Sequence, residues 1–195
     1  MRRCKVKEKL RIGLAMCGSF CTFSRALALA EDLAERYDLT AIVSETAAET
    51  DTRFGAARAH LERLEAITGK PVITTIPMAE PIGPEKRFDV LLIAPCTGNT
   101  MAKLAAGITD SAVTMAAKAH LRNGRPVVIA MSTNDGLAAG LKNVGELMVR
   151  KGYYFVPFGQ DDPEKKPNSL TADLTRAEAA VLAAADGRQY QPVLT

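Results

Sequence analysis

The sequence predicts a single α/β domain of three layers, in which a mostly parallel, Rossmann-like sheet carries helices on both faces. Short continuous apolar runs, such as 90–94 in the segment 88–94, are typical of strands that are buried on both sides of a parallel sheet. Segments with helical apolar spacing alternate with these runs along the chain. The 195 residues, 47% hydrophobic and 24% charged, fit one domain that buries a sizeable core.

In the N-terminal half the expected elements are a strand at 10–16, a loop at 17–21, a helix at 22–36, a strand at 39–43, a helix at 52–68 and a short strand at 71–73. Phe23, Leu27 and Ala30 recur at helical spacing and predict the first helix. Gly69 is a typical residue to end the second helix. Three prolines and Gly83 predict a loop without regular structure over 77–84.

In the C-terminal half the expected elements are a strand at 88–94, helices at 99–106 and 111–123, a strand at 126–131, a helix at 136–150, a strand at 153–156 and a helix at 170–185. The polar segment 159–169 predicts an exposed loop that is either functional or mobile. This order implies right-handed crossovers and a ligand crevice at the carboxyl ends of the strands.

The formal charge of +3 comes largely from basic residues near the start of the chain, so the remainder is close to neutral. This distribution argues against a nucleic-acid surface. We expect a basic tail at 1–9, a domain at 10–186 and a C-terminal tail at 187–195. No apolar run approaches the ~18 residues of a spanning helix, and no signal core follows the basic start, so we expect a cytoplasmic protein without a membrane partner.

The four cysteines are too few and too scattered for a disulfide framework. Cys17 and Cys21 have no neighbouring histidine cluster, so we expect no metal site. Cys96 is expected to be a small packing residue rather than a nucleophile.

Four strand ends are expected to meet at one crevice. Gly18 allows close backbone approach to a ligand and Ser19 offers a hydroxyl, although an ordinary strand-to-helix cap is the alternative. Ser44 ends the next strand and is either a ligand contact or a plain helix cap. The backbone N–H groups near 95–100, at the start of a helix, attract phosphate or carboxylate. The fourth strand end contains Ser132. The usual sequence patterns for binding ATP and NAD are absent.

The segment Pro-Cys-Thr-Gly-Asn-Thr-Met-Ala-Lys-Leu-Ala at 95–105 resembles the loop Pro-Ala-Ser-Ala-Asn-Thr before Ala-Lys-Leu-Ala in the flavoprotein superfamily of cysteine decarboxylases and flavin prenyltransferases. Three further segments resemble one family within it, the dipicolinate synthase B subunits. These are Met-Cys-Gly-Ser-Phe-Cys-Thr at 16–22, Ala-Met-Ser-Thr-Asn-Asp-Gly-Leu at 130–137 and Pro-Phe-Gly-Gln-Asp-Asp-Pro at 157–163. The resemblance covers roughly residues 10 to 186.

The resemblance implies roles for the strand ends. Ser44 would hold the phosphate of FMN, and the loop that follows the strand at 88–94 would face the flavin ring. Asn99 would contact a substrate carboxylate or the flavin, and Lys103 would supply charge unless it only lies on a solvated helix face. Asn99 and Lys103 are therefore the candidate catalytic residues. The candidate cofactor-binding residues are Gly18, Ser19, Phe20, Ser44, Pro95, Cys96, Thr97, Gly98, Thr100 and Ser132.

Members of the family convert 4-hydroxy-tetrahydrodipicolinate to dipicolinate during sporulation, by loss of water and of two hydrogens. The resemblance implies that the partner is the A subunit of dipicolinate synthase, which would carry NADP. It also implies a small dicarboxylate substrate, a homo-oligomer and a place in the mother-cell cytoplasm. The substrate clamp of the decarboxylases and the phosphate-binding arginine of the prenyltransferases have no counterpart near Ser132. An FMN-dependent decarboxylase-like enzyme and a non-catalytic assembly subunit without cofactor remain as alternatives.

Overall fold

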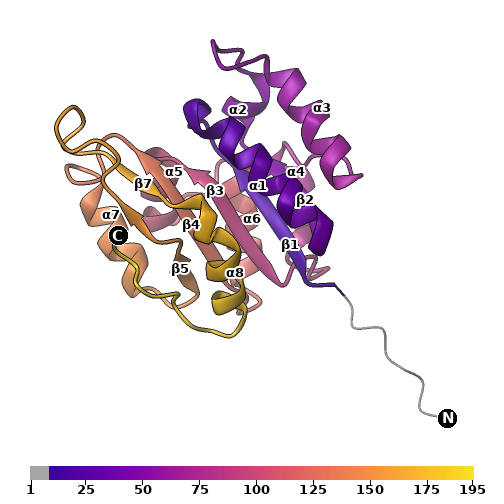
Figure 1. The fold of residues 1–195 in the computed structure, drawn as a ribbon. Helices are drawn as coiled ribbons and strands as arrows, with labels where there is room; N and C mark the ends of the chain where they lie inside the picture. Colours follow the sequence, from indigo (N-terminus) through magenta and orange to yellow (C-terminus); the bar gives the residue numbers. More distant parts are fainter. Residues whose placement is uncertain (1–8) are drawn as a thin grey trace.

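A seven-stranded sheet lies at the centre of the structure, a computed structural model that describes residues 9–195 (Figure 1). Its strands are β1 (Arg11–Met16), β2 (Asp38–Val43), β3 (Val90–Cys96), β4 (Val127–Thr133), β5 (Tyr153–Phe155), β6 (Phe158–Gly159) and β7 (Leu170–Ala172). The order is β2-β1-β3-β4-β7-β6, and β5 pairs with β4. Strands β1 to β5 pair in parallel, while β7 runs antiparallel to β4 and β6. The expected α/β class with a mostly parallel sheet is confirmed.

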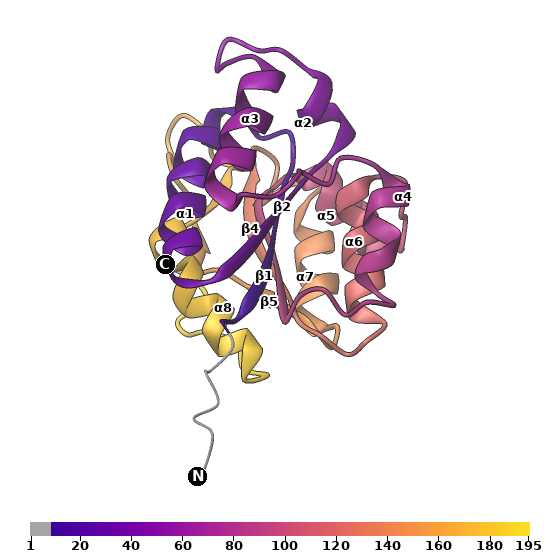
Figure 2. The ribbon, with the colours of Figure 1, turned by 90° about the vertical axis from the view of Figure 1, so that its right-hand side faces the viewer.

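The helices form layers on the two faces of this sheet. They are α1 (Phe23–Arg36), α2 (Glu45–Glu49), α3 (Ala57–Thr68), α4 (Ile76–Ala79), α5 (Gly98–Ala106), α6 (Ala112–Leu121), α7 (Leu141–Val149) and α8 (Ala177–Ala185), with short 3₁₀ turns η1 (Phe20–Thr22), η2 (Glu80–Ile82) and η3 (Leu174–Arg176). Figure 2 shows α1 and α8 over one face and α5, α6 and α7 over the other. No helix among residues 9–195 is long and apolar enough to cross a bilayer.

The core explains why the apolar runs become central strands. Every residue of β3 is buried, and the parallel register places Ile12 of β1 beside Leu39 on one neighbour and Val90 on the other. A strand that lies between two neighbours and under helices on both faces has no polar side, which is why its sequence shows no alternation. Helix α1 buries the residues at helical spacing, including Phe23, Leu27 and Ala30.

Two predictions before β3 are wrong. The expected loop at 77–84 contains α4 and η2, because Pro77 and Pro81 stand in the first turn of each, where the missing N–H has no partner in any case. The expected strand at 71–73 is reduced to one bridge between Ile42 and Ile73.

The helix expected at 52–68 is present but starts later. It begins at Ala57, where the Asp51 carboxylate accepts the Ala57 N–H at 2.8 Å.

The C-terminal part differs in a similar way. Residues 170–172 form β7 instead of a first helical turn, because they pair with β4 and β6, and α8 begins at Ala177. The helix expected at 136–150 begins at Leu141, and the short helix α2 was not predicted.

The two tails expected at the ends of the domain differ in what the structure describes. The basic tail at 1–9 lies outside the described residues except for residue 9. The tail at 187–195 is tied to the sheet by Thr195, whose N–H donates to the Phe158 carbonyl at 3.1 Å.

Candidate functional site

Two adjoining cavities lie at the carboxyl ends of β1 to β4. The Glu45 cavity, of about 370 Å³, is lined by Cys17, Gly18, Ser44, Glu45, Thr46, Thr97, Asn99, Thr100, Lys103, Asp110 and Ser111. The Ser132 cavity, of about 420 Å³, is lined by Gly18, Ser19, Cys21, Thr22, Arg25, Thr97, Gly98, Ser132, Thr133, Asn134, Asp161, Lys166, Ser169 and Thr171. Each volume lies in the range of small-molecule sites. Because Gly18 and Thr97 line both cavities, the two spaces form one crevice.

Gly18 keeps this crevice open. A Cβ added there would lie 3.6 Å from the Phe20 ring and 3.9 Å from the Thr46 methyl group, which is ordinary packing distance. Neither the backbone conformation nor a clash within the protein therefore requires glycine at this position. A side chain here would instead fill the space where the two cavities meet, which a ligand would need.

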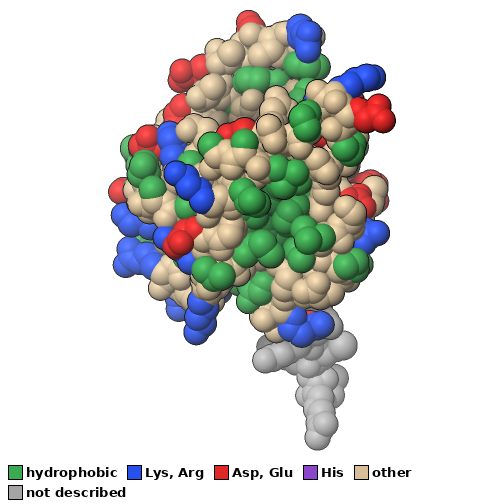
Figure 3. All heavy atoms as spheres, turned by 90° about the vertical axis from the view of Figure 1, so that its left-hand side faces the viewer, with side chains coloured by type: hydrophobic (Ala, Val, Ile, Leu, Met, Phe, Trp, Pro, Cys, Tyr) green, Lys and Arg blue, Asp and Glu red, His purple; other side chains and the backbone are tan. Residues whose placement is uncertain are grey.

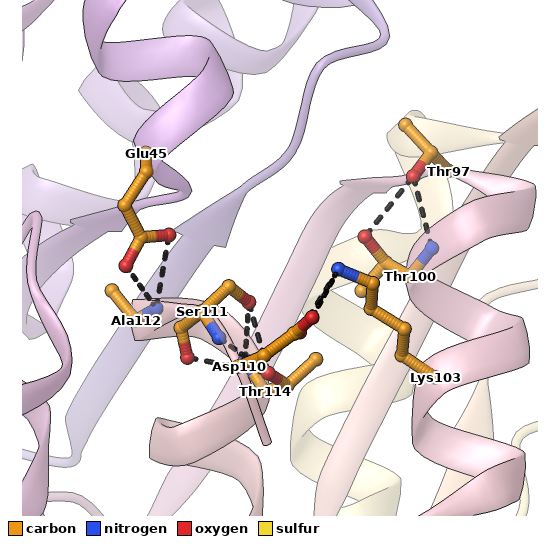
Figure 4. A network of polar contacts seen from close by, with 8 residues as sticks. All are labelled: Glu45, Thr97, Thr100, Lys103, Asp110, Ser111, Ala112 and Thr114. Atoms are coloured by element: carbon orange, nitrogen blue, oxygen red, sulfur yellow. Dashed lines mark hydrogen bonds and ion pairs between the residues drawn. The ribbon is translucent and has the colours of Figure 1, made fainter. Parts of the chain in front are cut away.

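Thr97 and Glu45 fix the helix starts around the Glu45 cavity (Figure 4). Thr97 caps α5, since its hydroxyl accepts the Thr100 N–H at 3.2 Å. The Glu45 carboxylate accepts the N–H of Ala112, the first residue of α6, at 3.0 Å and 3.2 Å. This carboxylate therefore compensates the positive end of the α6 dipole. The first turn of α6 is further satisfied by a capping box between Ser111 and Thr114.

The Glu45 cavity carries a negative charge balance. Lys103 lines it and pairs with Asp110 at 2.9 Å, so its charge is largely compensated (Figure 4). Glu45 adds a second carboxylate. One cation against two anions gives little electrostatic support to a phosphate that enters this side of the crevice.

The Ser132 cavity contains a group of three hydroxyls from distant parts of the chain. The Ser132 hydroxyl lies 2.8 Å from that of Ser19 and 3.0 Å from that of Thr22, although these residues are 113 and 110 positions away in sequence. Thr22 is only 2% exposed. Pairing of β1 with β3 and of β3 with β4 brings these residues together, because all three strands end at the same edge.

Charged side chains complete the Ser132 cavity. Arg25 and Lys166 line it with Asp161, and the Lys166 ammonium pairs with the Asp161 carboxylate at 3.2 Å. Hydrogen bonds from Ser169 and Lys166 lower the pKa of Asp161, so this group is a carboxylate at neutral pH. The segment expected as an exposed loop at 159–169 thus forms part of the crevice wall.

Two thiols face each other beneath the crevice. The Cys17 N–H donates to the Pro95 carbonyl at 3.1 Å, which places Cys17 opposite Cys96 across the β1–β3 pair. A hydrogen bond from the Cys96 thiol lowers the pKa of Cys17, whereas burial raises the pKa of Cys96. Cys17 lines the Glu45 cavity.

The structure brings most of the candidate residues to the crevice and leaves three outside its lining. Gly18, Ser19, Ser44, Thr97, Gly98, Asn99, Thr100, Lys103 and Ser132 line one cavity or both. Phe20 packs on the Phe23 ring at 5.2 Å, and Pro95 and Cys96 are buried in β3. Ser44 caps α2 through the Ala47 N–H, at a long 3.4 Å, and also borders the Glu45 cavity.

Several lining residues were missed by the sequence reasoning. Arg25 follows Thr22 at a spacing of three, which places both side chains on one side of the start of α1. This spacing is the sequence signal that could have identified Arg25 as a lining residue. Asp161 and Lys166 fall in the segment expected as an exposed loop, 159–169, and no local pattern shows that they border a cavity. Within residues 9–195, no cluster of three or more His, Cys, Asp or Glu side chains is arranged to hold a metal ion.

Comparison with known proteins agrees with the fold. The family model described as Flavoprotein matches residues 2–163, so the chain belongs to the flavoprotein family. The FMN-dependent cysteine decarboxylase SpaF has a similar structure, with a TM-score of 0.64 and 25% identity over 91% of this chain and 97% of that one. The family therefore includes relatives that use FMN.

Two relatives place the chain more narrowly. The B subunit of dipicolinate synthase from Bacillus subtilis (strain 168) is 43% identical over 185 residues, which are 94% of this chain and 92% of that protein. The crystal structure of the dipicolinate synthase B subunit from Bacillus halodurans C superposes with a TM-score of 0.88 at 43% identity, over 96% and 97% of the two chains. The chain is therefore grouped with the dipicolinate synthase B subunits, which are components of an enzyme and imply a partner, the A subunit.

Proposed function

We propose that this chain serves as the B subunit in the conversion of 4-hydroxy-tetrahydrodipicolinate to dipicolinate, a dehydration combined with a two-electron oxidation. The observation that carries this proposal is the crevice, in a chain similar over nearly its whole length to a dipicolinate synthase B subunit. The crevice offers hydroxyls, an amide and basic side chains, which suit a small dicarboxylate. The reaction belongs to the oxidoreductase class and takes place in the mother-cell cytoplasm during sporulation.

FMN is the cofactor that we assign to the crevice. The opening kept by Gly18 and the cap of α5 at Thr97 leave room for the ring and ribityl chain, while Ser44 and Thr46 offer hydroxyls to the phosphate. Bound FMN would supply a carrier for the two electrons that the oxidation releases. The residues fit the neutral part of the cofactor better than its phosphate, because the carboxylates of Glu45 and Asp110 repel the phosphate dianion.

Quenching of flavin fluorescence tests this assignment. The full chain should bind FMN and, with similar affinity, riboflavin, because the phosphate contributes little. Gly18→Val should abolish binding, since the new side chain fills the junction of the cavities. Gly145→Ala is the matched control, because a Cβ at that position meets no other atom within 4 Å. No binding of either flavin at millimolar concentration would overturn the assignment.

Asn99 and Lys103 are the residues to which we assign the handling of the substrate. Asn99 is exposed at the first turn of α5 and lines the Glu45 cavity, so its amide can donate to a substrate carboxylate. Lys103 stands one turn later and can exchange its Asp110 partner for a substrate anion. This pairing also holds Lys103 away from bulk solvent, with 28% of its side chain exposed.

The partner that we assign is the A subunit of dipicolinate synthase, with NADP bound on that partner. The chain alone should form no dipicolinate, whereas a mixture with NADP and the A subunit should. The loop at 159–169 borders the crevice, and Asp161, Lys165 and Lys166 are exposed there, so we expect it to contact the partner. Deletion of 162–166 should weaken association, measured by biolayer interferometry, without lowering Tm by more than a few degrees. Full activity of the chain alone, or unchanged association after the deletion, would contradict this assignment.

We also propose that the chain forms a homo-oligomer through the face that carries α7. Figure 3 shows hydrophobic side chains gathered on that side of the molecule. Leu141 and Met148 are exposed on α7, and Val149 is 83% exposed. A contiguous apolar surface of this kind is typical of an interface. Val149→Lys should shift the mass measured by light scattering toward the monomer, whereas an unchanged mass would exclude this face.

One alternative function has support from a particular observation. A non-catalytic protein that serves only in assembly would need no cofactor, and the negative charge balance of the Glu45 cavity favours a crevice without phosphate. The flavin titration separates the two proposals, because such an assembly protein binds neither FMN nor riboflavin. A decarboxylase-like enzyme would instead release CO₂ from a carboxylate in the absence of the A subunit.

A further inference from the structure

The two halves of the crevice carry opposite charge balances. Two cations and one anion line the Ser132 cavity, namely Arg25, Lys166 and Asp161, whereas one cation and two anions line the Glu45 cavity. Lys166 is already paired with Asp161. Arg25 makes no hydrogen bond or ion pair with any residue in the range 9–195 other than its helical backbone contacts. The Ser132 cavity therefore presents one guanidinium that is free to bind an anion.

The three hydroxyls of Ser19, Thr22 and Ser132 in the same cavity have one donor hydrogen that their mutual contacts do not use. The contacts of Ser132 with Ser19 and Thr22, at 2.8 Å and 3.0 Å, are normal O–H···O hydrogen bonds. The third side of the triangle, between Ser19 and Thr22, measures 3.3 Å and is too long for a good one. Ser19 and Thr22 also lie 3.9 Å and 3.8 Å from the Cys21 sulfur, which is only a weak acceptor. Three hydroxyl hydrogens thus serve two short contacts. One hydrogen is left to donate to a ligand in the cavity.

We propose that the Ser132 cavity binds one carboxylate of the substrate. Arg25 supplies the charge and two parallel donors, and the group formed by Ser19, Thr22 and Ser132 donates from the other side. A planar monoanion matches one guanidinium, whereas Asp161 opposes the second charge of a phosphate dianion. The identity of the dicarboxylate rests on the proposed function; the site and its preference for a carboxylate do not.

This assignment also orients the substrate. With one carboxylate at Arg25, the rest of a small ring lies beside Gly18 and Thr97, the residues common to both cavities, next to the space that the proposed function gives to FMN. The second carboxylate then lies on the side of Asn99, whose amide is exposed there. Arg25 is thus a specificity-determining residue that the strand-end motifs did not indicate.

Calorimetric titration of the full chain tests the site directly. Pyridine-2,6-dicarboxylate, pyridine-2-carboxylate and inorganic phosphate are the probes, at neutral pH and about 0.1 M salt, where the Debye length of about 10 Å still exceeds the distance of a direct contact. Arg25→Gln should weaken binding of the dicarboxylate at least about tenfold, and Arg25→Lys should weaken it less, since a lysine keeps the charge but not the planar pair of donors. Ser132→Ala should weaken it several-fold. Arg122→Gln, at an exposed arginine that lines neither cavity, is the control and should bind like the parent chain.

Three results would overturn the proposal: no dicarboxylate binding at millimolar concentration, unchanged affinity of Arg25→Gln, or phosphate binding as tight as dicarboxylate binding and equally dependent on Arg25. Thermal unfolding of each variant separates loss of the site from loss of the fold. In the mixture with the A subunit, Arg25→Gln should raise KM more than it lowers kcat. If the unaltered mixture forms no dipicolinate, the proposed function fails, while the titration still decides on the carboxylate site.

Discussion

Replacement of Glu45 separates the stability of the fold from the electrostatics of the crevice. Its carboxylate accepts the N–H of Ala112 with both oxygens, at 3.0 Å and 3.2 Å, and joins α2 to the start of α6. Glu45→Ala removes an acceptor worth about 0.5–2 kcal/mol at a helix N-terminus. It also removes a favourable charge on the helix dipole, worth about 0.3–1 kcal/mol. The half-buried position of Glu45 argues for a total loss of roughly 1–2 kcal/mol.

Glu45→Gln isolates the charge from the hydrogen bond. Its amide oxygen still accepts the Ala112 N–H, so the loss of unfolding free energy should be only about 0.3–1 kcal/mol. The same substitution removes one of the two anions of the Glu45 cavity. FMN affinity should therefore rise several-fold, while riboflavin affinity stays constant because riboflavin carries no phosphate.

Urea unfolding at neutral pH and flavin fluorescence titration measure the two effects. Glu49→Gln provides the control, since Glu49 is an exposed carboxylate on the same helix that does not line the cavity. An Ala variant as stable as the parent chain would refute the role of Glu45 as the acceptor of the first N–H of α6. Weaker FMN binding in the Gln variant would refute the argument that this carboxylate opposes the phosphate.

Three further predictions follow from the core and from α5. Burial lowers the pKa of His120 to about 4, so the folded state disfavours its protonation. The free energy of unfolding should thus fall by up to about 3 kcal/mol as pH drops from ~6.5 to ~4. In urea titrations over that range, His120→Gln should flatten this slope. Gly98→Ala puts a Cβ 2.7 Å from the Thr133 hydroxyl, so α5 or the Thr133 side chain must shift at the edge of the crevice, and flavin titration should show weaker binding. Asn99→Ala should lower dipicolinate formation by the two-subunit mixture more than about tenfold at an unchanged Tm, because Asn99 is exposed rather than packed.

Local sequence determined the elements whose periodicity is strong. The apolar run of β3 and the helical spacing in α1 predicted both elements to within a few residues. Gly69 ends α3 in the left-handed conformation, with φ of 65°, as the sequence indicated. These features depend on side-chain burial and backbone preference within one segment. For that reason a single sequence is enough to predict them.

Tertiary structure decided the elements that depend on a distant partner. Leu170–Ala172 belongs to a strand only because β4 and β6 offer it hydrogen bonds, and without them its composition equally suits a helix. The prolines in α4 and η2 were misjudged because their effect depends on which turn of a helix they occupy.

The site shows the same division. Sequence alone placed Ser19, Ser132 and Asn99 at strand ends and predicted that they share a crevice. It could not show that Ser132 contacts Thr22, that Glu45 accepts the first N–H of a helix 67 residues further on, or that Arg25 lines the cavity with Ser132 and Thr22. Those contacts are set by the register of parallel strands and the packing of helices on them. Such relations arise between segments, so no single segment carries the information that specifies them.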